Sequence, residues 1–385
     1  MPRHPQVSPS VADISGAVYS KLAHRLGQMS GEVYALHVGD TWMEPPVGAR
    51  MEDLRIADHP GMHRYTPPQG LPVLLDAIVA RQEARTGVPT TRDNVLVSTG
   101  ATGGLSAIAG AIVAPGDEVL ILAPFWPLVS GIVRSFHGIP VPVSFLGAES
   151  AEEVVDRLRA KLTPRTIAVY WNTPNNPSGL VLPKAWIETF VEWARHEGLW
   201  ILADEVYEDY VFGGDHAYTR TLAPERTFAA HSFSKAYGMA GNRCGYVVGP
   251  DSVMPDLRKV STHGFYSTPT AAQLAALVAL GPAGDAWVAA AKAQYAETGT
   301  QAATRLGVEA PQGSTFLFLD VAAELPRFGD RGLEGLLEAC VDRGLFVSPG
   351  PSFGPFPHHV RLCFTASPPE VVARGVEILA QVLGR

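Results

Sequence analysis

The segment SFSKAYGMAGNRCG (232–245) places a lysine, two serines and an arginine in a stretch without an acidic residue. Lys235 follows Ser232 and Ser234, and Arg243 comes eight residues later with a glycine two positions to either side. Hydroxyl donors, a forked cation and glycines that permit close backbone approach suit a phosphate group. A lysine near other positive charge and shielded from water has a lowered pKa and becomes a nucleophile. The segment therefore predicts a reactive lysine beside a phosphate site; the alternative is a loop with two ordinary surface cations.

Three further segments place polar groups directly after apolar runs. In LADEVYEDY (202–210), Asp204 ends such a run, and a carboxylate there is costly to bury unless it meets a cation or a donor. NTPNNPSG (172–179) follows another apolar run, and the glycine-rich STGATGG (98–104) lies where a strand leads into a helix. Backbone N–H groups in such a loop can hold a phosphate. Each segment taken alone is equally consistent with an ordinary turn.

Short apolar runs alternate with amphipathic ones along the middle of the chain. The runs are too short for core helices and predict strands at 119–123, 166–171, 199–204, 226–232 and 244–249. A capping box at Ser150 opens a predicted helix that ends near 161, and Pro183 is the predicted first residue of a helix over 183–196. This alternation predicts an α/β fold with a mostly parallel sheet and helices on both faces. Ligands of such sheets bind beyond the carboxyl ends of the strands, so the polar loops are expected to meet there.

The two ends of the chain follow a different pattern. Residues 8–30 predict an N-terminal helix, and a long alanine-rich helical stretch begins after about 270. The rest of the C-terminal part predicts a strand at 315–320, a helix over 331–343, a strand at 360–364 and a last helix. We expect a large domain over 46–274 and a smaller α+β domain built from 1–45 and 275–385.

Composition excludes several classes of protein. The 385 residues are 46% hydrophobic with a net charge of −8 and no Lys/Arg run, which disfavours a nucleic-acid partner. The uncharged stretch 94–116 contains five glycines, so we expect strand, loop and helix rather than a membrane span. Cys244, Cys340 and Cys363 form neither a disulfide framework nor a metal motif, and the first residues lack the apolar core of a signal peptide. A cytoplasmic protein without a bound metal is expected. The string GPSFG (350–354) matches a nucleophile elbow by chance, since prolines rather than a helix follow it.

Taken together, these segments resemble the class I/II aminotransferases among the fold-type I enzymes that use pyridoxal 5'-phosphate (PLP). Seven segments carry the resemblance in order: YTPPQG (65–70), STGATGG (98–104), PFW (124–126), NTPNNPSG (172–179), DEVY (204–207), SFSK with Arg243 (232–243), and RLCF (361–364). They span nearly the whole chain, and their order makes the match specific. The resemblance implies the fold-type I large domain and a smaller α+β domain.

The resemblance also implies how the cofactor ring is held. Lys235 is the implied covalent anchor and the group that moves the proton, and Asp204 is implied to pair with the pyridine nitrogen and keep it protonated. Asn176 and Tyr207 are implied partners of the ring hydroxyl oxygen. Trp126 is implied to stack on the ring; the alternative is a core residue.

The remaining implied roles concern the phosphate, the substrate and a second subunit. The phosphate is implied to be held by Gly100, Ala101, Thr102, Ser232 and Arg243. Arg361 is implied to bind the substrate α-carboxylate, next to Asn176 and with Gly39 allowing close passage of the chain. Tyr65 is implied to reach the phosphate of a partner subunit, which predicts a homodimer with shared active sites.

The predicted function is transfer of an amino group from an α-amino acid to PLP and then to a 2-oxo acid, in a ping-pong cycle. A C–S lyase or a cyclopropane-forming synthase on the same scaffold would need the same residues and stays open as an alternative. A regulatory protein with an aminotransferase-like domain is disfavoured because YTPPQG begins at 65, which leaves no room for an N-terminal DNA-binding domain.

The expected amino donor has a neutral aromatic or aliphatic side chain. In one aspartate-using branch of the family a lysine lies in the phosphate loop, where this chain has Thr102. The segment HVGDTWM (37–43), which is expected to line the pocket, contains no Lys or Arg, and neither does STHGFYST (261–268), which is expected to reach the substrate as a loop of the partner subunit. Apolar walls are expected from Trp42, Met43, Phe265 and Tyr266. The alternative is that Arg50 or Arg258 of a partner subunit reaches in and binds a side-chain carboxylate.

Overall fold

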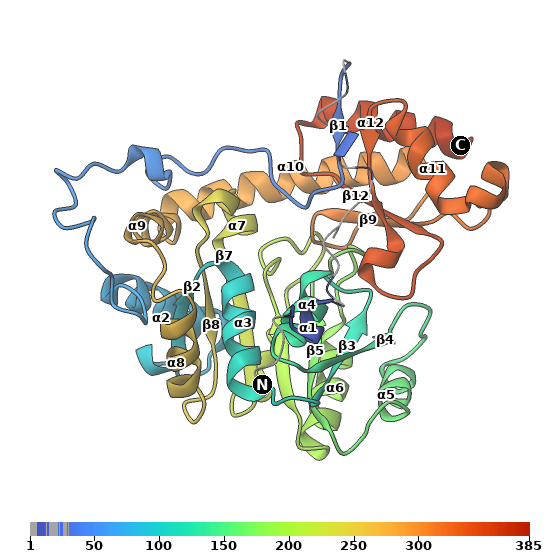
Figure 1. The fold of residues 1–385 in the computed structure, drawn as a ribbon. Coiled ribbons are helices and arrows are strands. Elements are labelled where there is room, and N and C mark those ends of the chain that lie inside the picture. The colour runs from blue at the N-terminus through green and yellow to red at the C-terminus, as the bar shows by residue number, and fades with distance from the viewer. Residues whose placement is uncertain (1–5, 13, 15–21, 23, 26–28, 30) are drawn as a thin grey trace.

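The computed structural model describes residues 6–12, 14, 22, 24–25, 29 and 31–385. A sheet of seven strands forms the centre of the molecule (Figure 1), in the order β2-β8-β7-β6-β5-β3-β4. Its strands are β2 (Val95–Ser98), β3 (Glu118–Ala123), β4 (Ile139–Ser144), β5 (Thr166–Asn172), β6 (Trp200–Asp204), β7 (Thr227–Ser232) and β8 (Gly245–Val248). All neighbours pair in parallel except β8, which is antiparallel to both β2 and β7. The five predicted strands are present, and the prediction of a mostly parallel α/β sheet is confirmed.

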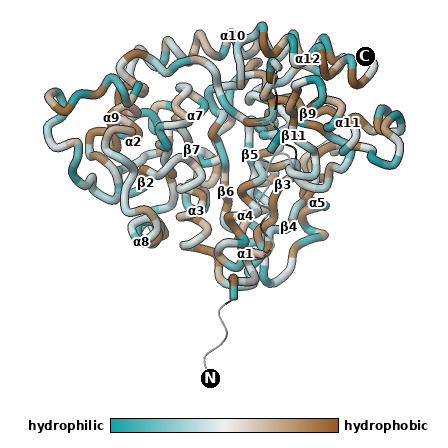
Figure 2. Tube along the Cα trace, turned by 45° about the horizontal axis from the view of Figure 1, so that its top comes forward, coloured by the Kyte–Doolittle hydropathy of each residue, from teal (hydrophilic) through white to brown (hydrophobic). Residues whose placement is uncertain are grey.

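Helices cover both faces of this sheet. They are α2 (Pro72–Thr86), α3 (Gly100–Ile112), α4 (Leu128–Ser135), α5 (Ala151–Arg159), α6 (Lys184–His196), α7 (Phe233–Ala236), α8 (Met254–Gly264) and α9 (Thr270–Ala279). Alternate strand side chains point to opposite faces, so one set packs against α3, α4 and α8 and the other against α5 and α6. The tube in Figure 2 is accordingly brown along the central strands. The strands are buried on both sides and need no alternation of polar residues.

The predicted helix starts are only partly right. Ser150 Oγ accepts from Glu153 N at 3.2 Å, as the capping box predicts, but the Glu153 carboxylate accepts from Glu149 N rather than from the backbone of Ser150. Pro183 lies at the N-cap with extended backbone instead of inside the first turn, so α6 begins at Lys184. Of the helix predicted over 8–30, α1 (Pro9–Ala12) is described; most of the remaining prediction lies outside the described residues.

Segments from both chain ends build a second layer beside the large sheet. The strands β9 (Phe316–Asp320), β11 (Ser348–Pro349) and β12 (His359–Cys363) form an antiparallel sheet, and β1 (Tyr34–Ala35) pairs in parallel with β10 (Leu345–Phe346). The helices α10 (Pro282–Leu306), α11 (Gly332–Val341) and α12 (Pro369–Leu383) share one apolar core with β1. The N-terminal and C-terminal parts therefore pack together, while the exact division at 46 and 274 stays a prediction.

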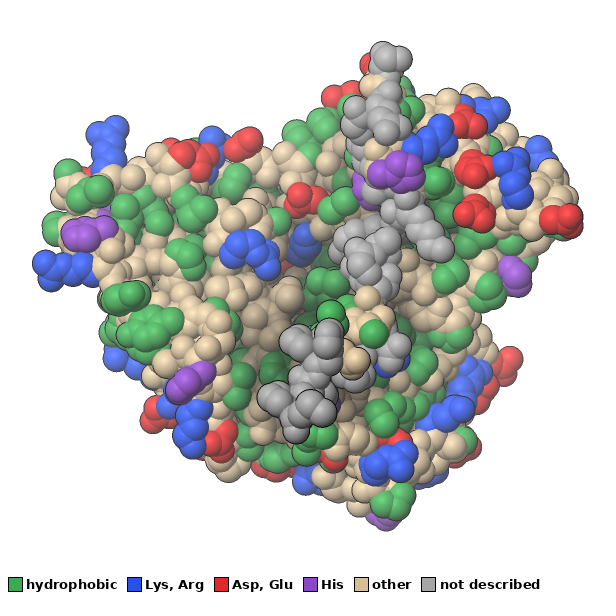
Figure 3. Space-filling model, viewed as in Figure 1, with side chains coloured by type: hydrophobic (Ala, Val, Ile, Leu, Met, Phe, Trp, Pro, Cys, Tyr) green, Lys and Arg blue, Asp and Glu red, His purple; other side chains and the backbone are tan. Residues whose placement is uncertain are grey.

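The structure also describes the two segments for which a membrane span and a nucleophile elbow were set aside. The stretch 94–116 forms β2 and α3, as expected, and GPSFG lies in a short 3-10 turn at Gly350–Phe353. No single helix in the described part of the chain is long and apolar enough to cross a membrane; α9 and α10 meet that measure only as a pair bent by 74°. Acidic and basic side chains are interspersed on the face shown in Figure 3.

Candidate active site

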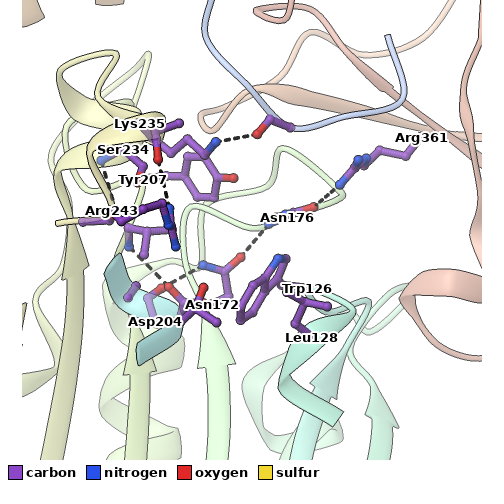
Figure 4. Close-up of a pocket in the computed structure, with 16 residues that line it drawn as sticks. Trp126, Leu128, Asn172, Asn176, Asp204, Tyr207, Ser234, Lys235, Arg243 and Arg361 are labelled. Atoms are coloured by element: carbon purple, nitrogen blue, oxygen red, sulfur yellow. Dashed lines mark hydrogen bonds between the residues drawn. The ribbon is translucent and has the colours of Figure 1, made fainter. Parts of the chain in front are cut away.

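The polar loops meet in one pocket, as predicted for the carboxyl ends of parallel strands. β5, β6 and β7 contribute their last residues, α3 and α7 contribute their first turns, and β12 adds Arg361 (Figure 4). The residues that line the pocket are Gly39, Ala101, Thr102, Trp126, Leu128, Asn172, Asn176, Asp204, Val206, Tyr207, Ser232, Ser234, Lys235, Ala240, Arg243 and Arg361. The pocket thus combines residues that are up to about 320 positions apart in the chain.

Lys235 lies near the end of the short helix α7, and its side chain points into the pocket. Its Nζ donates to the carbonyl of Gly39 and lies 4.0 Å from the Asp40 carboxylate. Burial lowers the pKa of Lys235, and Asp40 opposes this effect. The hydroxyl of Tyr210 donates to the carbonyl of Lys235 at 3.0 Å and so fixes the backbone that carries the amine. The result is an amine with reduced proton affinity, which is the condition for a nucleophile.

Asp204 ends β6 and is almost completely buried. Its Oδ2 accepts from the Tyr170 hydroxyl at 2.6 Å, and its Oδ1 accepts from Val206 N at a longer 3.4 Å. Burial raises the pKa of Asp204 to about 6, against the lowering effect of the hydrogen bond from Tyr170. A carboxylate held in this state has room for one more donor, and a protonated ring nitrogen is such a donor.

The N-terminus of α3 and Arg243 form a cradle for an anion. Arg243 has a left-handed backbone (φ +53°), and its Nη2 lies so close to Gly100 that a Cβ on Gly100 would be 2.8 Å from it. A Cβ on Gly245 would lie 2.8 Å from Ala101 N, so both glycines allow the loops to approach. Unpaired N–H groups at a helix N-terminus and a guanidinium together bind phosphate. Ser232 adds a hydroxyl at the pocket wall.

Arg361 is fully buried between two aromatic rings. Its guanidinium carbon lies 4.3 Å from the centre of the Phe316 ring and 4.6 Å from that of Phe353. Nη1 donates to Asn176 Oδ1 at 2.9 Å, and Nη2 donates to the carbonyl of His37. Burial and the positive charge of Arg361 lower the pKa of His37 to about 4, which keeps this histidine neutral. The planar guanidinium is held in one orientation and can donate to a carboxylate that approaches from the pocket side.

Tyr207 and Trp126 complete the pocket wall. The Tyr207 ring meets Phe316 edge to face with centroids 5.9 Å apart, and burial raises the pKa of Tyr207 far above its ordinary value. Trp126 presents its ring to the pocket next to Leu128 (Figure 4). A neutral phenol and an indole face suit a flat, partly polar ring. The donor set as a whole fits an aromatic group that carries a phosphate and a ring nitrogen.

Some predicted residues lie elsewhere. Gly100 lies behind Arg243 rather than in the wall, and Tyr65 is 87% exposed, with its ring 5.1 Å from that of Tyr266 and away from the pocket. Trp42 and Met43, which were expected as apolar walls, do not line the pocket of this chain. Phe265 and Tyr266 were expected to reach the substrate from a partner subunit, and that expectation stays a prediction. Trp42 and Tyr266 are partly exposed. A role for Tyr65 and Tyr266 toward a second subunit stays a prediction.

Several residues that line the pocket were not predicted from the sequence, and Asn172 is the most informative of them. Asn172 ends β5 beside Asp204 in the register of the sheet, and its amide donates to the carbonyl of Asp204 at 2.8 Å. Its Oδ1 accepts from Asn176 N at 2.6 Å, so one side chain joins two segments of the pocket. A polar residue that closes an apolar strand was the signal used for Asp204, and the same signal marks Asn172.

Comparison with known proteins gives a consistent result. The model of the family "Aminotransferase class I and II" matches residues 33–379. The aspartate/prephenate aminotransferase of Thermus thermophilus is 34% identical over 370 residues, covering 94% of each chain, and the arginine–pyruvate transaminase of Pseudomonas aeruginosa is 32% identical over 65% of this chain and 64% of its own. The structure of the Thermus thermophilus aspartate aminotransferase with maleate superimposes with a TM-score of 0.88 at 29% identity, covering 98% of this chain and all of the other.

Proposed function

Since the chain belongs to the family of class I and II aminotransferases and is a PLP-dependent enzyme acting on amino acids and 2-oxo acids, we propose which pocket residues bind the cofactor, bind the substrate and carry the proton. When bound, PLP supplies the electron sink that the reaction needs at the substrate Cα. Every other contribution has to come from the chain: a nucleophilic amine, a counter-charge for the ring nitrogen, an anion cradle and a carboxylate clamp. The pocket holds one candidate for each.

Lys235 is the proposed covalent anchor and proton carrier. Its amine points into the pocket, and burial lowers its pKa, so it can both give up and take a proton at the substrate Cα. The Gly39 carbonyl and the fixed backbone of Lys235 restrict where the amine can reach. Restricting the amine in this way reduces the entropy lost when the reacting atoms meet.

The cofactor's polar groups have separate proposed partners. Asp204 faces the ring nitrogen, and Asn176 and Tyr207 face the ring hydroxyl oxygen. The phosphate is assigned to the start of α3, with Gly100, Ala101 and Thr102, and to Ser232 and Arg243. Trp126 covers one face of the ring. The support for these roles is that all but Gly100 line the same pocket.

Arg361 is the proposed clamp for the substrate α-carboxylate. The Phe316 and Phe353 rings and the bond to Asn176 hold its guanidinium in place, while Gly39 lies at the same wall. A clamped carboxylate fixes the orientation of the substrate Cα relative to the ring, and this orientation decides which bond is activated.

The single observation that carries the proposal is the convergence of Lys235, Asp204 and Arg361 on one pocket from α7, β6 and β12. Its test is borohydride reduction of the PLP-loaded protein followed by peptide mapping. We expect the pyridoxyl group on Lys235 and no label in Lys235→Ala. Lys292→Ala, which changes a half-buried lysine outside the pocket, should keep the label. Label on another lysine in the wild-type protein would refute the assignment.

For the donor, we propose a neutral side chain. Among the described residues that line the pocket, the cations are Lys235, Arg243 and Arg361. Each is already assigned, to the covalent link with the cofactor, to its phosphate and to the substrate α-carboxylate respectively. A second substrate carboxylate would therefore be buried without a counter-charge from this subunit, next to Thr102, Trp126 and Leu128. The names of the relatives do not support this preference, since one is named for aspartate and prephenate and another for arginine. They do favour transamination over the elimination alternative.

The donor proposal is tested by kcat/KM for phenylalanine, methionine and aspartate with one 2-oxo acid acceptor. We expect either neutral donor to exceed aspartate by tenfold or more, about 1.4 kcal/mol of transition-state binding. Thr102→Lys should raise kcat/KM for aspartate. Thr102→Met should not raise it, because methionine is about as long as lysine but carries no charge. An aspartate preference of tenfold in the wild-type enzyme would show that a cation from outside this pocket serves the side chain.

A further inference from the structure

Tyr170 and Asp204 form a hydrogen-bonded pair beneath the pocket floor. Tyr170 lies on β5 opposite Leu202 of β6, and Asp204 lies two residues further along β6 on the same face of the sheet. The phenol therefore reaches diagonally across to the carboxylate, and its hydroxyl donates to Asp204 Oδ2 at 2.6 Å. Tyr170 is fully buried, and Asp204 is only 3% exposed. Water does not compete for this bond, so it is stronger than a similar bond at the surface.

The bond distinguishes the two oxygens of the carboxylate. Oδ2 is occupied by a short charge-assisted bond, whereas Oδ1 accepts only the long 3.4 Å bond from Val206 N among the bonds described. Asp204 itself lines the pocket while Tyr170 does not. We propose that Tyr170 is a positioning residue, which holds Asp204 ionised and in one rotamer so that Oδ1 is presented to the ring nitrogen of PLP. The proposal rests on the role assigned to Asp204 above.

The electrostatic surroundings explain why such a donor is needed. Burial disfavours the charged carboxylate and raises the pKa of Asp204 to about 6, and the negative Glu205 next to it acts in the same direction. The hydrogen bond from Tyr170 is the first effect that opposes burial, followed by the bond from Val206 N and the charge of His231 on β7. Tyr207, which lines the same pocket as Asp204, Lys235 and Arg243, is held neutral by burial, which raises its pKa. The pKa of Tyr170 is also raised well above its usual value by burial, so it remains a donor at all working pH values.

The test compares Tyr170→Phe with Tyr246→Phe. Each substitution removes one buried hydroxyl and keeps the ring. Tyr246 is also buried, its hydroxyl accepts from Gln82 at 3.0 Å, and it does not line the pocket. Both variants lose a hydrogen bond and some stability. Only the first should change Asp204.

The direct measurement is the ionisation of Asp204 in the apoprotein, from infrared difference spectra of the carboxyl band against Asp204→Asn. We expect a midpoint near 6 in the wild-type protein. In Tyr170→Phe it should rise by about one pH unit, because a charge-assisted bond to the ionised form is lost. Tyr246→Phe should leave it unchanged. A midpoint in Tyr170→Phe equal to that of the wild type would overturn the proposal.

The second measurement is the affinity of each apoprotein for PLP as a function of pH. We expect Tyr170→Phe to bind PLP about twofold more weakly at neutral pH and on the order of tenfold more weakly near pH 5, with the gap closing at alkaline pH as its Asp204 ionises. If Asp204→Asn weakens binding and Tyr170→Phe does not, the positioning role is wrong while the function of Asp204 stands. If neither affects binding or the absorption spectrum of bound PLP, the role of Asp204 itself is wrong and the inference fails with it.

Discussion

Replacing Arg361 by lysine tests the carboxylate clamp while keeping its positive charge. The guanidinium fills the space between the Phe316 and Phe353 rings, 4.3 and 4.6 Å from their centres, and binds Asn176 Oδ1 and the His37 carbonyl. An ammonium group is a point charge without a planar fork, so it cannot keep both bonds and also pair twice with a substrate carboxylate. Arg361→Lys should therefore weaken transition-state binding of any α-amino acid.

The size of the effect follows from the bonds lost. One charge-assisted bond to the substrate contributes about 1.5–3 kcal/mol, and a buried acceptor left unpaired, such as Asn176 Oδ1, costs about 1–3 kcal/mol. Part of the second cost is also present in the free enzyme, so we expect a net loss of about 3 kcal/mol, or on the order of 100-fold in kcat/KM. PLP affinity should stay within about threefold of the wild-type value, because Arg361 is assigned to the substrate and not to the cofactor.

Steady-state kinetics with several amino donors, together with PLP titration, separate the two binding events. Arg220→Lys is the matched control: Arg220 is 3% exposed, donates to Thr90 Oγ1 at 2.8 Å and lies outside the pocket, so this variant shows the general cost of a buried arginine-to-lysine change. Wild-type kcat/KM in Arg361→Lys would refute the clamp. A loss that matched the Arg220→Lys loss, or that fell on PLP affinity alone, would refute it equally.

Three further predictions follow from the site. Asp204→Asn should still bind PLP but lose turnover by orders of magnitude, since an amide cannot hold the charge of a protonated ring nitrogen; single-turnover rates measure this, and near-normal rates would contradict it. The protein should sediment at twice 41.1 kDa or more, because Tyr65, 87% exposed here, is assigned to the partner's phosphate; a fully active monomer would rule this out. Burial and the charge of Arg361 lower the pKa of His37 to about 4 in the folded protein. His37 should therefore stabilise the fold fully above pH 6.5, and this stabilisation should be lost as the pH falls from 6.5 toward 4. Urea unfolding of the apoprotein across that range should show a smaller decrease in His37→Gln; equal slopes would show that His37 does not titrate there.

Most of the large sheet could be predicted because its strands are continuous apolar runs. Each of the five predicted strands is buried on both faces, so its sequence carries no competing helical pattern. β4 was missed because IPVPVS contains two prolines and lies at the edge of the sheet, where one side makes no ladder bonds. The order of the strands, with β8 reversed, depends on pairing between distant segments, which periodicity does not encode.

The pocket was predictable where a polar residue interrupts or ends an apolar pattern. Asp204 stands out in this way, whereas Lys235 and Arg243 stand out as cations in a segment without an acidic residue; all three line the pocket. The apolar wall expected from Trp42 and Met43 was wrong, because these residue types also suit a core and only the path of the chain shows that they lie outside the pocket.

Tyr170 shows why residues beneath a site are harder to find than residues in it. In TIAVYWN an aromatic residue within a buried strand is what the core itself requires, and Tyr170 belongs to the same apolar cluster as Leu202 and Phe228. The hydroxyl becomes informative only when the parallel register of β5 and β6 brings it to Asp204, 34 positions away in the chain. When a tyrosine both packs in the core and donates a hydrogen bond, the sequence pattern indicates the packing but not the hydrogen bond. Substituting phenylalanine for Tyr170 therefore leaves the pattern that predicts the fold intact and removes only the bond to Asp204.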